Sequence, residues 1–233
     1  MSLPKIDLPI MELTLPSNGK KIKYRPFTVK EEKILLVAQE SDNAEQEILA
    51  SRQVVNNCLV GTEVSSLAMF DLEYVMLFIR SQSVSNSLQF AITDNETEEE
   101  VRLEIDINDI KITKDKDHTN KIKINDEYTL ILKYPTIDEF VQISAMNQND
   151  PLISYFIMVT CLESIASADE VFKFSDYTEE QINAFMEDMS GSVIKGIEVF
   201  FDTMPKLRHE IKYKNKNGTD KTFVIEGMKS FFI

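Results

Sequence analysis

Two short runs of alternating hydrophobic and polar residues stand near the N-terminus, at residues 11–15 and 21–24. They are joined by Pro16-Ser17-Asn18-Gly19, and an Asn-Gly pair between alternating runs indicates a β-hairpin, because both residues tolerate a positive φ. Pro26 ends the second run. Thr28-Val29-Lys30-Glu31 then has the spacing of a capping box, in which the two outer side chains bond to each other's free amides. The pattern predicts a hairpin that leads into a capped helix.

The rest of the first half is patterned as helices followed by a second hairpin. Apolar residues recur at helical spacing after the cap, and later runs alternate as strands do. Gly61 is the expected end of the second helix, and Asp71 is a candidate cap for the third. We predict helices over residues 30–39, 44–59 and 72–80, and strands over residues 88–92 and 101–107.

A carboxylate-rich segment, residues 93–100, separates the two strands of this second hairpin. Such a cluster can indicate metal binding, but the spacing of a calcium loop is missing. We therefore interpret the segment as a solvated hairpin tip.

The same order of elements returns in the second half. A hairpin with a turn at residues 125–127 stops at Pro135, and Thr136-Ile137-Asp138-Glu139 forms a second capping box. A helix over residues 152–165 carries Cys161, as the earlier helix carries Cys58. Further helices are predicted over residues 179–189 and 193–204, and a hairpin over residues 209–225.

This recurrence predicts an α+β fold with two similar halves, each made of a β-hairpin, a small helical bundle and a closing β-hairpin. We expect an N-terminal half at residues 1–112, a linker at 113–120, which contains no apolar residue, and a C-terminal half at 121–233. The capping threonines and the two cysteines recur at nearly the same offset, which indicates an internal duplication. Chance alignment of amphipathic helices is the alternative.

The composition narrows the functional classes. With 43% hydrophobic residues the 233-residue chain can form a core, and its net charge of −14 argues against nucleic acid and anionic membranes as partners. No apolar run approaches the ~18 residues that span a bilayer. Two cysteines are too few for a disulfide framework, so we expect reduced, buried thiols and a cytoplasmic setting.

Candidate chemistry is sparse. His118 and His209 have no cysteine or second histidine at zinc-ligand spacing, and Cys58 and Cys161 stand in apolar surroundings typical of inert thiols. No phosphate-binding glycine motif or nucleophile elbow is present. Paired carboxylates at Glu163 and Asp169 are the remaining enzymatic hypothesis, and a solvated helix face explains them as well. We predict no catalytic residue, cofactor or metal, and so no enzyme.

The chain ends on Phe231-Phe232-Ile233. An apolar end must be covered by other groups. Packing on its own domain and docking to another subunit are the two alternatives, and these three residues are the candidate partner-binding site. The edge strands of the two terminal hairpins are a further candidate surface, through strand addition.

Several stretches resemble one known family. Leu15-Pro16-Ser17-Asn18-Gly19-Lys20 and Tyr24 to Glu32 are similar to the N-terminus of T4-type bacteriophage baseplate hub subunits and hub-assembly proteins. Leu132 to Thr136 and Ile225-Glu226-Gly227-Met228 with the terminal Phe231-Phe232 are weaker matches. Together these stretches extend over most of the chain.

The resemblance implies a part in building the baseplate of a contractile phage tail, as a hub component or as an assembly chaperone. It implies other baseplate and hub proteins as partners, and the host cytoplasm during assembly or the virion tail as location. Some family members resemble zinc knuckles, with paired cysteines in the hairpins. The hairpins here contain none, so we expect strand pairing and packing alone to hold them. A cytoplasmic α+β adaptor unrelated to phage is the alternative function.

Overall fold

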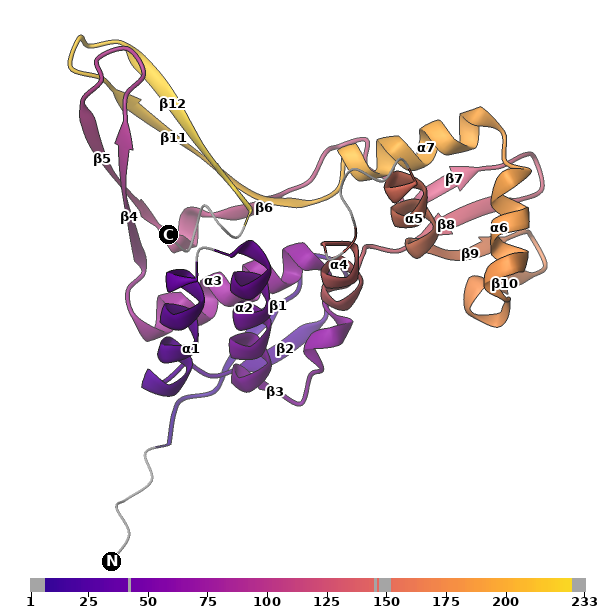
Figure 1. Cartoon of the computed structure of the whole chain (residues 1–233), viewed down its shortest axis with the longest axis horizontal. Coiled ribbons are helices and arrows are strands. Elements are labelled where there is room, and N and C mark those ends of the chain that lie inside the picture. The colour runs from indigo at the N-terminus through magenta and orange to yellow at the C-terminus, as the bar shows by residue number, and fades with distance from the viewer. Residues whose placement is uncertain (1–6, 42, 145, 147–151, 228–233) are drawn as a thin grey trace, which may run out of the picture. The chain divides into compact units, whose positions relative to one another are not determined.

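A computed structural model describes residues 7–41, 43–144, 146 and 152–227. Its contacts divide the chain into two compact units: unit 1 contains residues 1–113 and 206–233, and unit 2 contains residues 114–205. Each unit combines helices with small antiparallel sheets (Figure 1), which confirms the predicted α+β class.

Unit 1 contains three hairpins: a short one at its start, and two long ones formed by β4 with β5 and by β11 with β12. Its elements are β1 (Met11–Thr14), β2 (Lys21–Tyr24), α1 (Val29–Glu40), α2 (Ala44–Cys58), β3 (Leu59–Val60), the 3-10 helix η1 (Val64–Ser66), α3 (Met69–Ser83), β4 (Ser87–Thr93), β5 (Glu100–Asp106), the 3-10 helix η2 (Ile107–Asp109), β6 (Lys111–Thr113), β11 (Lys206–Lys214) and β12 (Asp220–Glu226).

The first hairpin and its helix cap form as the sequence predicts. Strand β1 pairs antiparallel with β2, and β2 also pairs with the short β3. In the turn only Gly19 takes a positive φ, of 71°, while the Asn18 side chain accepts a hydrogen bond from the Lys20 amide. Thr28 is the N-cap of α1, and both bonds of the capping box to Glu31 are present. Local turn and cap chemistry therefore determine this segment.

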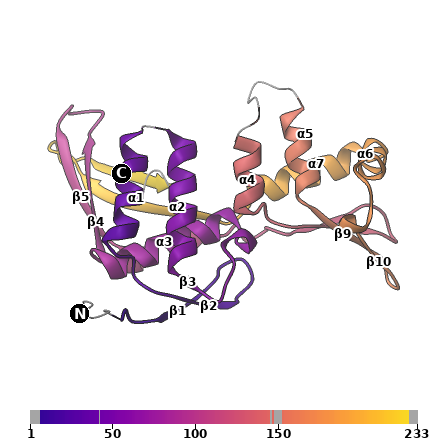
Figure 2. The same cartoon turned by 60° about the horizontal axis from the view of Figure 1, so that its bottom comes forward.

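Helix α3 is the buried centre of unit 1. Leu72, Val75, Leu77 and Ile79 are fully buried, and Figure 2 shows α1 and α2 side by side, with α2 also in contact with α3. The predicted cap at Asp71 is wrong, because the helix already begins at Met69. The Asp71 carboxylate is buried within the helix, where it accepts the Ser17 amide of the first hairpin at 3.0 Å.

Strand β3 was missed by the sequence pattern. The second helix ends at Cys58, and Leu59 and Val60 continue as the strand that pairs with β2. Gly61, the expected end of the helix, follows this strand with a φ of 70°. Two residues are too few for an alternating pattern, and the pairing with β2 bridges more than thirty residues of sequence.

The last hairpin belongs to unit 1, although the predicted boundaries put it in the C-terminal half. Strand β11 pairs with β6 as well as β12, with Leu207 opposite Ile112. Leu207 and Ile225 are fully buried in one cluster with Leu77 and Leu88. Long-range strand pairing therefore groups the end of the chain with its first half, and a local pattern carries no information about this pairing.

Unit 2 has one four-stranded antiparallel sheet in the order β10-β9-β8-β7. Its core contains Leu130, Leu132, Ile197 and Phe200. The elements are β7 (Lys121–Lys123), β8 (Thr129–Leu132), α4 (Ile137–Ser144), α5 (Ile153–Thr160), β9 (Leu162–Ala166), β10 (Val171–Lys173), the 3-10 helix η3 (Phe174–Asp176), α6 (Glu179–Glu187) and α7 (Gly191–Asp202).

The predicted helix over residues 152–165 is only half helical. Helix α5 stops at Thr160, Cys161 caps it, and Leu162 begins strand β9. The apolar run fits either structure, and pairing of β9 with β8 and β10 decides the outcome.

The segment predicted as a linker is partly packed. His118 lies against Tyr134 and Phe200 in unit 2, with ring centroids 5.7 and 5.3 Å apart. Its two ring nitrogens lie 2.9 Å from the hydroxyls of Thr203 and Tyr134. Burial lowers the pKa of His118. The contact division falls directly after Thr113, the first residue of this segment, so that residues 114–120 belong to unit 2.

Both units contain a hairpin, two helices, a cysteine, a strand that pairs with the hairpin, a 3-10 helix and a further helix, in that order. The recurrence is compatible with the predicted duplication. Common origin of the two copies stays a prediction.

Candidate functional site

Within each unit, the side chains considered for catalysis do not form a common site. Burial raises the pKa of the Cys58 thiol to about 11 and that of the Cys161 thiol to about 12, so both thiols are protonated at neutral pH. His118 bonds to Thr203 and Tyr134, and His209 lies on β11 opposite Ile225. In neither unit does the histidine contact the thiol of the same unit.

The explanation of Glu163 and Asp169 as part of a solvated helix face is wrong, because neither residue lies on a helix. Glu163 is exposed on β9, and Asp169 is exposed in the turn between β9 and β10. Across the ranges that the structure describes, no group of three or more His, Cys, Asp or Glu side chains is placed to hold a metal ion. In the same ranges no helix is long and apolar enough to cross a membrane.

Each cysteine lies instead beside an ion pair that the sequence analysis missed. In unit 1 the Arg25 guanidinium donates to Glu31 at 3.0 Å, and the Arg25 amide donates to the Cys58 carbonyl at 2.9 Å. In unit 2 the Lys133 ammonium lies 2.5 Å from Glu139, and the Lys133 amide donates to the Cys161 carbonyl at 2.8 Å. We call these the two cap clusters. A basic residue three positions before each capping threonine was the available signal.

Glu31 is the most constrained carboxylate of the cap clusters. It is 2% exposed and accepts hydrogen bonds from the Thr28 amide at 2.8 Å and the Thr28 hydroxyl at 2.6 Å. Burial alone would raise its pKa, but the bonds from Arg25 and Thr28 outweigh burial and hold the pKa at about 2. The cap cluster of unit 1 thus connects the start of α1 to the end of the first hairpin, and we assign it a structural role.

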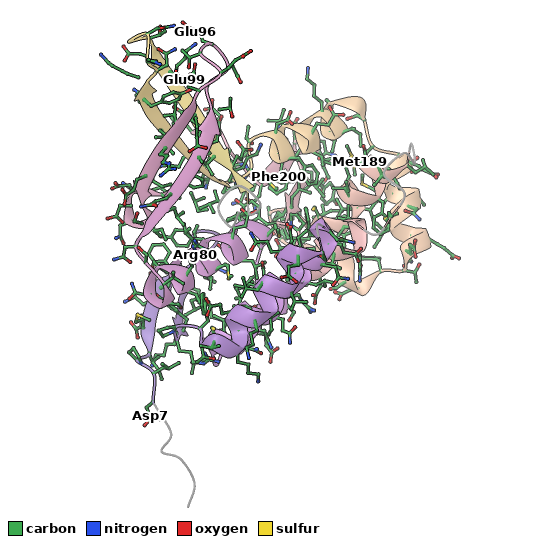
Figure 3. All side chains as sticks on the ribbon, turned by 60° about the vertical axis from the view of Figure 1, so that its left-hand side comes forward. Asp7, Arg80, Glu96, Glu99, Met189 and Phe200 are labelled. Carbon is green, nitrogen blue, oxygen red and sulfur yellow. The ribbon has the colours of Figure 1, made fainter. Side chains whose placement is uncertain are left out.

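The acidic segment is the tip of the β4–β5 hairpin, as predicted, and most of its residues are exposed. Some of its side chains are in addition bonded to the β11–β12 hairpin of unit 1. Asp94 is 1% exposed and accepts the Tyr213 hydroxyl at 2.7 Å. Figure 3 shows Glu96 and Glu99 at the tips of the hairpins, where Lys221 lies 2.6 Å from Glu96. The Tyr213 bond and the turn amides hold the pKa of Asp94 well below its usual range.

We call this set the tip cluster: Asp94, Glu96, Glu99, Tyr213, Asn215, Lys216 and Lys221. The expectation that strand pairing and packing alone hold the hairpins is therefore incomplete. Hydrogen bonds and ion pairs between the tips also hold them, and the side chains come from segments more than a hundred residues apart in sequence.

An apolar groove opens on unit 2 between the turn that joins β7 and β8, the β9–β10 hairpin and α6. Its volume is about 480 Å³. Two ring pairs line it: Tyr128 and Phe172, with centroids 6.5 Å apart, and Phe174 and Phe185, at 5.7 Å. Tyr177 is 41% exposed beside them. The complete lining of this aromatic groove is Ile124, Asn125, Tyr128, Ile165, Phe172, Phe174, Tyr177, Gln181, Ile182 and Phe185.

The sequence pattern does not reveal this groove, because its lining comes from four separate segments. The closely spaced Phe172, Phe174 and Tyr177 were the available signal. The three residues predicted to bind a partner, Phe231, Phe232 and Ile233, lie outside the described residues. Of the two terminal hairpins, β1 and β12 are the strands at the sheet edges, because β2 and β11 each pair on both sides.

The fold is that of a small α+β protein, and the aromatic groove is open on the surface of unit 2. The family model described as T4 bacteriophage base plate protein matches residues 8–233. The chain therefore belongs to this family, and it is a phage baseplate structural or assembly protein. Searches of the curated proteins and of the solved structures return no match.

Proposed function

We propose that the chain is a non-enzymatic component of the baseplate hub, or a factor that assists hub assembly, and that it acts through contacts with other baseplate proteins. The observation that carries the proposal is the family match over residues 8–233, which includes both units. This match argues against the alternative function, an adaptor unrelated to phage, because the matched family is a phage family.

The surfaces support a role in binding. The aromatic groove exposes apolar rings, and β1 and β12 are sheet edges that another strand can extend. The thiols, by contrast, are buried and protonated at neutral pH, a state that disfavours nucleophilic chemistry.

The test is affinity capture of the tagged full-length chain from infected cells, combined with mass spectrometry of purified virions. We expect other baseplate proteins to be captured. Presence in virions at a fixed stoichiometry would identify a hub component, and capture without presence in virions would identify an assembly factor. Failure to capture any baseplate protein at any stage of infection would contradict the proposal.

A further inference from the structure

Carboxylates surround the aromatic groove of unit 2. Lys173 is the only basic residue between Tyr134 and Ile194, the stretch that contains most of the lining, and Lys123 stands beside Ile124 in the remaining lining segment. Eight exposed acidic residues stand one or two positions from a lining residue, against two exposed lysines, Lys123 and Lys173. The acidic residues are Asp126, Glu127, Glu163, Glu170, Asp176, Glu179, Glu180 and Glu187. The groove therefore combines an aromatic floor with a negative border.

Two of these carboxylates affect the hydroxyl of Tyr128, one of the aromatic residues that line the groove. The hydrogen bond between Tyr128 and Glu127 raises the pKa of the tyrosine hydroxyl, and the nearby Glu170 carboxylate raises it further. Glu127 precedes β8 and Glu170 precedes β10, so the carboxylates approach Tyr128 from two different segments. A cation that entered here would interact with both.

We propose that the aromatic groove docks a segment of a partner protein in which apolar side chains are flanked by lysine or arginine. This inference rests on the proposed function and names the chemistry of its partner. Apolar anchors would remove water from Phe172 and the rings beside it, and the flanking cations would pair with the border and stack on Tyr177. The volume of about 480 Å³ lies within the ~300–1,000 Å³ of compact binding sites.

Charge complementarity selects this occupant over the others. An acidic or neutral apolar segment would gain the same contact with the rings but would meet repulsion, or no attraction, at the border. A second copy of this chain carries the same net charge of −14, which opposes the approach of two copies at long range.

The first experiment measures binding of two labelled peptides to the full-length chain by fluorescence anisotropy. In one peptide lysine alternates with leucine and phenylalanine, and in the other glutamate replaces each lysine. We expect only the lysine peptide to bind, with an affinity that falls as salt is raised. The double variant Glu170→Lys/Glu179→Lys should bind it about tenfold more weakly.

The matched control is Glu198→Lys/Asp202→Lys on α7, which changes the net charge equally with no change at the groove lining. This control should bind the lysine peptide within about twofold of the wild-type affinity. Tyr177→Ala, at an exposed position of the groove, should also weaken binding. The inference is overturned if the groove and control double variants weaken binding equally. It is also overturned if the groove double variant leaves binding unchanged, or if Tyr177→Ala leaves binding unchanged.

The second experiment places a photo-crosslinking benzoylphenylalanine at Tyr177 in infected cells and maps the crosslinked segment by mass spectrometry. An apolar segment of another baseplate protein with flanking lysine or arginine supports the inference. A neutral or acidic segment, a second copy, or the chain's own residues 228–233 overturns it. If affinity capture recovers baseplate proteins but Tyr177 crosslinks to none, the groove inference fails and the proposed function stands.

Discussion

The two cap clusters make a matched comparison of buried and partly exposed ion pairs within one chain. In unit 1 the side chains of Arg25 and Glu31 are 26% and 3% exposed, whereas those of Lys133 and Glu139 are 39% and 20% exposed. Glu31→Gln and Glu139→Gln remove one carboxylate charge each. Glutamine can still accept the threonine amide, as Gln181 does in the capping box of α6.

We expect Glu31→Gln to lower the free energy of unfolding by about 2–3 kcal/mol at pH 7. The displacement of the Glu31 pKa from its ordinary 4.5 to about 2 corresponds to about 3 kcal/mol. Loss of one partner of a buried pair costs ~3–5 kcal/mol, and the partial exposure of Arg25 reduces this penalty. Glu139→Gln should cost ~1 kcal/mol or less, because water screens the more exposed pair.

The effect depends on pH with a definite sign. The pKa of Glu31 is lower in the folded state, so its stabilisation is complete above the ordinary value of 4.5 and is lost as the pH falls toward 2. At pH 3.5 about 1.4 kcal/mol of the contribution should be gone, and the difference between wild type and Glu31→Gln should shrink by that amount.

The assay is urea unfolding followed by circular dichroism, at pH values between 7 and 3.5, for the wild type and both variants. Thr28→Ala, which removes the cap hydroxyl and leaves the Arg25–Glu31 pair, should cost about 1 kcal/mol and serves as a reference. Equal losses for Glu31→Gln and Glu139→Gln, or a Glu31→Gln loss that does not change with pH, would refute the assignment of the stabilisation to the buried charge.

Three further outcomes are expected. Cys58 and Cys161 should resist a thiol reagent at pH 8 in the folded protein, because burial keeps both thiols protonated, and should react within minutes in denaturant. Rapid labelling of the native chain would contradict this expectation. Gly196→Ala should destabilise by ~1–3 kcal/mol in urea unfolding, because its Cβ would lie 2.7 Å from Ile122 Cγ2; a gain in stability would show that the helix and strand can separate. Asp94→Asn should speed hydrogen exchange at both hairpin tips by about threefold to tenfold, and unchanged exchange at the second tip would exclude a clamping role.

Local chemistry explains the parts of the fold that the sequence predicts well. A capping box needs only four residues, and the turn at Gly19 needs one positive φ, so Thr28 and the first hairpin are found without knowledge of the rest. The family resemblance was likewise readable from short stretches, and the family match confirms it.

The tertiary structure decided what depends on contacts between distant segments. Leu162 begins a strand because it pairs with Leu132 of β8. The last hairpin belongs to unit 1 because Leu207 of β11 pairs with Ile112 of β6. The tip cluster and the aromatic groove arise in the same way, since their side chains come from separate segments. Sequence by itself determined the first turn, the capping boxes, the acidic character and the family. Only burial and long-range pairing determined which charged side chains are enclosed and which aromatic ones stay open to a partner.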